Sequence, residues 1–252
     1  MNQRTGESSQ SKINIRADTT LGNLVTEYPS LAREFERRGF DYCCNGHQTI
    51  ADACRAQGLD PEAIVVEIAG TTTDQQTEPW GRMDVSALVD HLEATHHSYL
   101  RHELPRLSSL IEKIEAVHGD RHPELAEVAR CYQELRADLE PHLLKEEQIL
   151  FPMIRELAAS VTAPEFHCGS LQNPITVMMA EHQRAGHLLG QLSELTERYQ
   201  PPDDACNSYR ACFSGLAELD ADTRFHIHKE NNVLFTAVVA LEKKLFRQCG
   251  RP

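Results

Sequence analysis

The sequence predicts an all-α protein, and three observations lead to that prediction. Leu, Ala and Glu are abundant and aromatic residues make up only 6% of the chain, a composition that favours helices over sheets. Along four long segments, apolar residues recur at alternating steps of three and four, which is the spacing of one face of a helix. The connections between these segments are short, so the four helices are expected to pack as an antiparallel four-helix bundle.

The chain divides into regions of different pattern. Short helical patterns with their own start and stop signals, such as Pro61 after Asp60 and a helix-ending Gly39, precede the four long segments. A polar, unpatterned stretch separates the two and marks a domain boundary. The predicted regions are a disordered N-terminus at 1–17, a small helical module at 18–70, a linker at 71–83 and the bundle at 84–249.

An internal repeat lies within the predicted bundle. Residues 141–152 read P-H-L-L-K-E-E-Q-I-L-F-P and residues 225–235 read F-H-I-H-K-E-N-N-V-L-F. In both copies a histidine and a glutamate stand four residues apart, which places them on the same face of a helix. The matched residues are His142 with His226 and Glu146 with Glu230, each pair 84 residues apart.

These histidines and glutamates fall on the apolar faces of their helices. A carboxylate buried without compensation costs several kcal/mol. One His–Glu pair can satisfy itself, but two copies at a fixed offset favour a shared cation. The two faces are Val128, Tyr132, Leu135, Leu139, His142, Glu146, Ile149 and Met153, and Cys212, Leu216, Leu219, Thr223, His226, Glu230, Val233 and Ala237.

His97 and His182 extend the repeat to the other two helices, because both lie on apolar faces, 85 residues apart. Four imidazoles and two carboxylates without a thiolate suit first-row transition metals better than structural zinc, calcium or magnesium. The set is too large for one tetrahedral ion and fits two ions bridged by Glu146 and Glu230. The alternatives are six polar core residues that satisfy one another, and a bundle stapled by zinc.

Charge and composition exclude several other functions. The formal net charge is -13, so neither a nucleic acid nor an anionic membrane surface is expected as a partner. The N-terminal residues lack the apolar core of a signal peptide, and no apolar run reaches membrane-spanning length. A cytoplasmic location with reduced cysteines is therefore expected. Five cysteines are expected to be small buried residues: Cys54, Cys131, Cys206, Cys212 and Cys249.

These motifs resemble a known family. The H-x-x-x-E pairs in H-L-L-K-E-E-Q-I-L-F-P and H-I-H-K-E-N-N-V-L-F, with single histidines on the intervening helices, resemble the hemerythrin-like di-iron domain. The stretch D-Y-C-C-N-G-H in the small module resembles the additional domain of the iron-sulfur cluster repair proteins, the repair-of-iron-centres (RIC) or ScdA-like family. The resemblance covers nearly the whole chain after the polar N-terminus.

The resemblance implies two Fe ions in an oxo- and carboxylate-bridged centre. It implies repair of iron-sulfur clusters damaged by nitrosative or oxidative stress, through iron donation, nitric oxide reduction or both. The implied partners are damaged iron-sulfur proteins, nitric oxide or oxygen as a small ligand, and a second copy of the chain in a homodimer. A hemerythrin-type sensor or store of oxygen or nitric oxide is the alternative. The implied metal ligands are His97, His142, Glu146, His182, His226 and Glu230.

One ligand position departs from the oxygen-carrying hemerythrins that the bundle resembles. Their third bundle helix carries a second histidine four residues after the first, where this chain has Gly186. The missing ligand is expected to open the site, which favours reactivity or iron release over reversible carriage. Asn45 and Thr236 also differ from the residues of many relatives, and neither is an implied ligand.

Cys43 and Cys44 form a second candidate functional site. Two adjacent cysteines just after a helix end would be exposed in an open loop, and exposed thiols react in proportion to their thiolate character. Thiol redox chemistry, transient iron ligation and nitrosylation are the functional interpretations, beside simple packing of the module. Glu181, which precedes His182 in the sequence, is a candidate acid that supports the metal ligands. Five histidines off the apolar faces are expected to be solvated: His91, His96, His102, His187 and His228.

Overall fold

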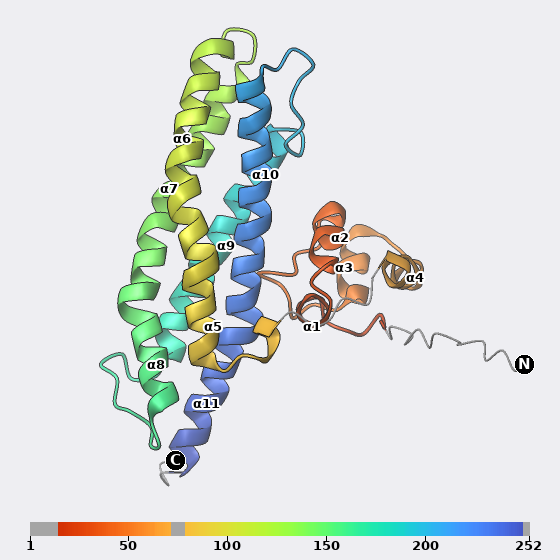
Figure 1. Cartoon of the computed structure of the whole chain (residues 1–252). Helices are drawn as coiled ribbons and strands as arrows, with labels where there is room; N and C mark the ends of the chain where they lie inside the picture. The colour runs from red at the N-terminus through yellow and green to blue at the C-terminus, as the bar shows by residue number, and fades with distance from the viewer. Residues whose placement is uncertain (1–14, 72–78, 249–252) are drawn as a thin grey trace, which may run out of the picture.

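The computed structural model describes residues 15–71 and 79–248 of the chain. Every regular element in these two ranges is a helix. Four long helices run antiparallel in an elongated bundle, and a module of four short helices stands against one side of it (Figure 1). None of the described helices is both long enough and apolar enough to span a membrane. Residues 1–14 of the predicted disordered N-terminus, 72–78 of the predicted linker, and Cys249 lie outside the described residues.

The helix ends of the small module follow local sequence signals. Gly39 follows α2 with a φ of 68°, a left-handed conformation that glycine adopts without strain. Thr49 begins α3 through a reciprocal cap, because its hydroxyl accepts from the Asp52 backbone N–H and the Asp52 carboxylate accepts from that of Thr49. The module consists of α1 (Leu21–Glu27), α2 (Leu31–Arg38), α3 (Ile50–Gln57) and α4 (Pro61–Thr71).

The long helices of the bundle are interrupted by π-helical turns, except for the third. A short 3-10 helix, η1 (Pro79–Arg82), leads into them. The first helix comprises α5 (Val85–Leu92), the π turn η2 (Glu93–His97) and α6 (Ser98–His118). The second comprises α7 (Glu124–Lys145), the π turn η3 (Glu146–Leu150) and α8 (Phe151–Ala159). The third is α9 (Gln172–Leu195), and the fourth comprises α10 (Asn207–His228), the π turn η4 (Lys229–Leu234) and α11 (Phe235–Gln248).

The π turns shift the buried face of each helix by one residue. A regular helical spacing placed Ile149 and Ala237 in the core, but Ile149 is 49% exposed and Ala237 is exposed too. Leu150 and Val238 are buried instead, at 1% and 0% exposure. A π turn adds one residue to the helical repeat, and each shift follows a turn that begins at or just before a predicted glutamate ligand. The sequence-based prediction of Ile149 and Ala237 as core residues was wrong for this reason.

The predicted metal ligands lie between two hydrophobic cores. One core joins α6, α7 and α10 with the later half of α9 and with the small module, and includes Leu104 and Leu135. The other joins α5, α8, α11 and the beginning of α9, and includes Leu92 and Ile154. Apolar side chains on both sides keep water from the polar residues between them, so electrostatic interactions there are strong.

Asn232 attaches the small module to the bundle. Its side-chain amide donates to the backbone carbonyls of Tyr42 and Cys43, each at 3.2 Å. Gly46 makes this approach feasible, because a Cβ on it would lie 2.6 Å from the Tyr42 carbonyl and closer still to Asn232 Oδ1. A Cβ on Gly22 of α1 would lie 2.7 Å from the same Oδ1. The module therefore sits directly on the π turn η4, which carries Glu230.

Candidate metal centre

The six predicted ligands meet inside the bundle. They form two groups of four, in each of which the ligand atoms all lie within 4.8 Å of one another. All six residues are at most 3% exposed. The first group is His97, Glu146, His226 and Glu230, and the second is His142, Glu146, His182 and Glu230.

Each glutamate faces two histidines, one from each group. Glu146 Oε2 lies 3.5 Å from His97 Nε2, and its Oε1 lies 3.4 Å from His142 Nε2. Glu230 Oε1 lies 3.2 Å from His226 Nε2, and its Oε2 lies 3.1 Å from His182 Nε2. A carboxylate with one oxygen directed to each of two positions is the arrangement of a bridging ligand.

Buried polar atoms at this centre lack hydrogen-bond partners. Both carboxylate oxygens of Glu146 and Glu230, and Nε2 of His97 and His226, have no partner of hydrogen-bonding geometry among the described residues. Such atoms are rare in protein interiors because each one loses its hydration without replacement. A cation in each group would satisfy them, and imidazole with carboxylate is a donor set suited to first-row transition metals. The residues present fit a pair of such ions.

The pKa values respond to the same crowding of charge. Burial disfavours the charged form of His142, but the Glu146 carboxylate outweighs it and raises the pKa of His142 to about 9. Burial likewise opposes the charge on Glu230, yet His226 and His182 hold its pKa well below the ordinary value. Burial lowers the pKa of His97. The negative charge of the buried carboxylates is therefore compensated either by protons on the histidines or by metal ions that replace those protons.

Three of the four histidines are oriented by a second residue at Nδ1. His97 Nδ1 lies 2.7 Å from Glu147 Oε1, and His142 Nδ1 lies 2.8 Å from Glu181 Oε2. His182 Nδ1 lies 2.9 Å from Asn231 Oδ1. Such contacts fix the tautomer of a ligating histidine and aim its Nε2 at the metal.

The supporting residues were only partly predicted. Glu181, the predicted supporting acid, contacts His142 through its carboxylate and also pairs with Lys145. Glu147, which pairs with Arg101, and Asn231 were missed. Both immediately follow a repeated glutamate, so the repeat itself was the signal that could have found them.

Two histidines expected in solvent are buried. His96 is 4% exposed, and its ring stacks on that of His226 at 5.1 Å with 8° between the planes. His228 is fully buried against the small module, where its Nε2 lies 3.2 Å from Thr26 Oγ1. Burial lowers the pKa of each to about 4, so both rings are neutral at pH 7. His102 and His187 are exposed, as predicted.

The cysteine pair lies against the bundle instead of in an open loop. Cys43 is 1% exposed and only Cys44 is partly exposed, so the loop is not open and the packing alternative describes Cys43. Cys44 Sγ lies 3.6 Å from the backbone carbonyl of the predicted ligand His182. A Cβ on Gly186 would lie 3.4 Å from the same sulfur. Cys44 therefore fills the space toward which a side chain at position 186 would project.

The other cysteines follow the prediction with one exception. Cys54, Cys131 and Cys212 are buried as expected, whereas Cys206 is exposed at the beginning of α10. All described cysteines are free thiols.

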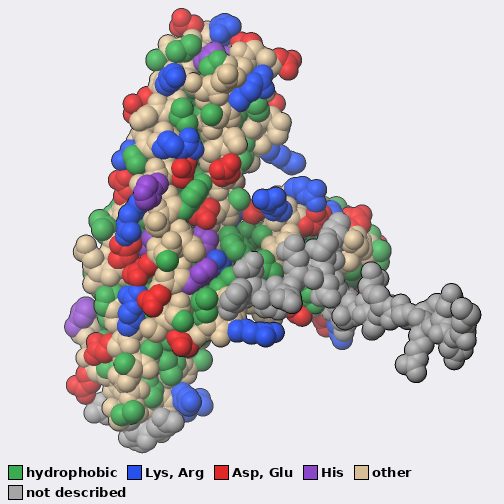
Figure 2. All heavy atoms as spheres, viewed as in Figure 1, with side chains coloured by type: hydrophobic (Ala, Val, Ile, Leu, Met, Phe, Trp, Pro, Cys, Tyr) green, Lys and Arg blue, Asp and Glu red, His purple; other side chains and the backbone are tan. Residues whose placement is uncertain are grey.

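One cavity reaches the centre, and a larger one lies beside the cysteine pair. A cleft of about 1110 Å³ separates the small module from α9 and α10, and Cys43 and Cys44 lie at its inner end. Figure 2 shows the corresponding hollow between the module and the bundle, on a surface where acidic and basic side chains are interspersed. A smaller cavity of about 250 Å³ is lined by His142, His182 and the Lys145–Glu181 pair. It leads from the surface to one of the two metal groups.

A helical bundle with an enclosed set of histidines and glutamates is the architecture of the hemerythrins. In agreement, residues 88–238 match the family described as the Hemerythrin HHE cation binding domain, and residues 17–71 match ScdA_N, a domain of unknown function (DUF542). The bundle is a hemerythrin-type cation-binding domain, which confirms the predicted fold class.

Comparison with whole proteins identifies the family. The chain is 35% identical to the "Iron-sulfur cluster repair protein YtfE" of Citrobacter koseri over 225 residues, which cover 89% of this chain and 98% of the relative. The proteins of the same name from Enterobacter sp. (strain 638) and Escherichia coli (strain K12 / DH10B) are 36% and 35% identical over the same shares. The chain belongs to the family of iron-sulfur cluster repair proteins, as its motifs indicated.

Proposed function

We propose that this chain is a di-iron protein that repairs iron-sulfur clusters damaged by nitrosative or oxidative stress. The observation that carries the proposal is the placement of Glu146 and Glu230, both fully buried and each facing one histidine of either metal group. In this proposal the two glutamates bridge the ions, and His97, His142, His182 and His226 are terminal ligands. When bound, two iron ions would supply one-electron chemistry, coordination of small ligands and transferable iron.

The protein residues would hold the ions firmly but not close the centre. Glu147, Glu181 and Asn231 orient three of the histidines, which favours metal binding. Gly186 contributes no ligand, and the cavity beside His142 and His182 gives ions, nitric oxide or oxygen a route to the second group. These features support iron donation or nitric oxide reduction over reversible storage.

The proposed domains are the small module (18–70), the linker (71–83) and the bundle (84–249). In this proposal the small module takes part in the repair activity together with the bundle. Cys43 and Cys44 lie where this module meets the carbonyl of His182, and we include both in the functional site. Replacement of both by serine should leave the iron content of the bundle unchanged and reduce repair in cells, and undiminished repair would contradict the assignment. Cytoplasmic location and a homodimer through this module are further parts of the proposal, to be tested by fractionation and by sedimentation.

The proposal is tested by the metal content and Mössbauer spectrum of anaerobically purified protein. The two measurements are made before and after mixing with an apo iron-sulfur protein. Two coupled irons per chain that move to the acceptor are the expected result. Two coupled irons that stay would move the function to nitric oxide chemistry or to sensing. Zinc, or protein without metal, would contradict a di-iron function.

The bridging role is tested by Glu146→Ala and Glu230→Ala. Because each carboxylate belongs to both groups, each substitution should remove both irons and not one. Glu140→Ala is the matched control, since Glu140 lies on α7 with its side chain 49% exposed and pairs with Arg136 at the surface. An iron-replete double variant would contradict the bridging assignment.

A further inference from the structure

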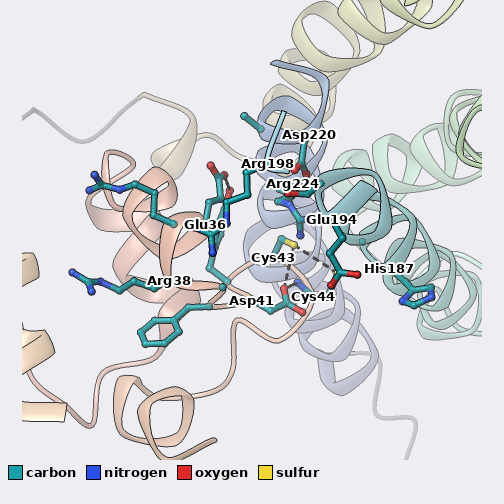
Figure 3. Close-up of a pocket in the computed structure, with 18 of the residues that line it drawn as sticks. Glu36, Arg38, Asp41, Cys43, Cys44, His187, Glu194, Arg198, Asp220 and Arg224 are labelled. Carbon is teal, nitrogen blue, oxygen red and sulfur yellow. Dashed lines mark hydrogen bonds and ion pairs between the residues drawn. The ribbon is translucent and has the colours of Figure 1, made fainter. Parts of the chain in front are cut away.

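A second cluster of metal-binding side chains lies outside the bundle. Asp41, Cys43 and Cys44 place a carboxylate oxygen and two sulfurs within 4.8 Å of one another. They belong to the loop that follows α2 of the small module. Figure 3 shows them together at the inner end of the cleft, with Glu194 of α9 and Arg224 of α10 on the bundle side.

The distances within this cluster lie within a few tenths of an ångström of the edges of a tetrahedral metal site. The two sulfurs are 3.7 Å apart. Metal–thiolate bonds of about 2.3 Å in a tetrahedral site separate two sulfurs by about 3.8 Å. Asp41 Oδ1 lies 3.2 Å from Cys43 Sγ. A metal–oxygen bond of about 2.0–2.2 Å on the same ion would separate these two atoms by about 3.6 Å, so they would have to move apart by a few tenths of an ångström. Three donors thus surround one position.

The loop holds these donors in place without a metal. Asp41 Oδ1 accepts from the backbone N–H of Cys44 at 2.9 Å, and its Oδ2 accepts from the side chain of Asn45 at 2.7 Å. The backbone carbonyl of Cys43 accepts from Asn231 and Asn232 of the bundle. Little rearrangement is therefore required for binding, which favours affinity.

We propose that Asp41, Cys43 and Cys44 form a second metal site, which takes a thiophilic divalent ion and keeps its fourth position open to the cleft. Carboxylate and thiolate together suit Fe²⁺ or Zn²⁺ better than the hard cations Ca²⁺ and Mg²⁺. Closed structural sites have four protein ligands, whereas an open position admits a ligand from outside. A cysteine of an acceptor protein is such a ligand.

The site is coupled to the bundle centre by one residue. Asn231 Oδ1 accepts from His182 Nδ1–H at 2.9 Å, and Asn231 Nδ2 donates to the Cys43 carbonyl at 3.1 Å. Cys44 Sγ also approaches the His182 carbonyl. Both contacts involve His182, so the cysteine pair adjoins a ligand of the second metal group. The proposal extends to transfer of a ferrous ion from that group to the two thiols.

This transfer rests on the proposed function, whereas the site itself does not. Bonds from Fe²⁺ to histidine and carboxylate break, and bonds to the two sulfurs and to Asp41 form. The two thiol protons pass to water. The iron remains ferrous, so no oxidant or reductant takes part.

Titration of the metal-free full-length protein with Co²⁺ under anaerobic conditions tests the site. Cobalt bound to thiolate has a charge-transfer band in the near ultraviolet, which cobalt bound to histidine and glutamate lacks. We expect three cobalt ions per chain, one of them with the thiolate band. Uptake of only two ions without this band would overturn the proposal.

Variants assign the band. Cys43→Ser with Cys44→Ser should abolish it, and Asp41→Asn, which keeps an acceptor for the Cys44 N–H, should weaken cobalt binding by at least about tenfold. Cys206→Ser, at an exposed cysteine before α10, is the control and should leave the band unchanged. A band that survives the double serine variant would overturn the assignment.

The same experiment separates this site from the bundle centre. The Glu146→Ala, Glu230→Ala variant should lose the two bundle ions and retain the thiolate band. Loss of the band in that variant would contradict the proposal that the second site binds metal independently of the bundle centre. If the variant keeps both the band and the two bundle ions, the second site stands and the bridging role of Glu146 and Glu230 is contradicted.

Discussion

The two halves of the bundle repeat supply equivalent candidate metal ligands but surround them differently. In the first half, Glu147 follows Glu146, contacts His97 and pairs with Arg101 at the surface. In the second half, the equivalent Asn231 holds His182 with a neutral amide and reaches the module at Cys43. The next position is exposed Gln148 in the first half and the module-binding Asn232 in the second.

The difference shows how a bundle with two similar halves contacts the small module through one half. A carboxylate at 231 would place a negative charge against the Cys43 carbonyl, where an amide can donate instead. Residues 146–148 read E-E-Q and reach the surface after Glu146, whereas residues 230–232 read E-N-N and bind the small module through their two amides. The second half of the bundle is therefore the half that contacts the cysteine pair.

The largest effect is expected from detaching the module, which removes the difference between the halves. Gly46→Ala brings a Cβ to 2.6 Å from the Tyr42 carbonyl, and overpacking against backbone should cost up to about 3 kcal/mol of docking free energy. Weaker docking of the module should make the linker easier to cleave in limited proteolysis and faster in hydrogen exchange, while the metal content of the bundle stays the same. Gly190→Ala is the control, because its Cβ meets nothing within 4 Å and the helix should gain about 0.5–1 kcal/mol. If the linker is equally protected in the Gly46→Ala and Gly190→Ala variants, Gly46 is not required for docking of the module.

A smaller effect distinguishes the two supporting residues. Glu147→Ala removes a charged partner of His97 and should weaken metal binding by about 10- to 100-fold. Asn231→Ala removes a neutral partner of His182 and should weaken it less, because hydrogen bonds to ionised groups are about twice as strong. Competition with a chelator measures both affinities. Gln148→Ala, at an exposed neighbouring position, should have no effect, and equal losses in all three variants would remove the proposed distinction.

The smallest effect concerns a contact between the halves far from the metal. His122 contacts Glu124 of the first half and Asp204 of the second, each at 3.0 Å, and these carboxylates raise its pKa above 6.5. Because the folded-state pKa is the higher one, the stabilisation is full below the unfolded value of 6.5 and is lost as pH rises through the folded value. His122→Gln should therefore lose less than about 1 kcal/mol at acidic pH and nothing at alkaline pH.

Thermal unfolding of both proteins on either side of this pH range measures the difference. The exposed loop residue His167 provides the control substitution His167→Gln. A loss of stability that is the same at both pH values would show that His122 contributes by packing and not by charge.

The sequence was sufficient to predict the fold class and to bring six residues together as candidate ligands, because helical period and internal repeat are both local signals. It was not sufficient for the residues downstream of each glutamate, since a π turn changes the register without a periodic signature. His228 was misjudged for another reason. A second face of α10 is buried by the small module, and the amphipathic pattern of one helix does not reveal a partner from elsewhere in the chain.

The close contact of Asn232 with Gly22 and Gly46 limits how this protein can be recombined. A Cβ at either glycine would lie too close to the Asn232 side chain, and a Cβ at Gly46 would also lie too close to the Tyr42 carbonyl. A hybrid of this bundle with the module of another protein would therefore assemble only if all three positions were exchanged together. The two domains are a matched pair, and for protein engineering the smallest portable unit is the pair and not either domain.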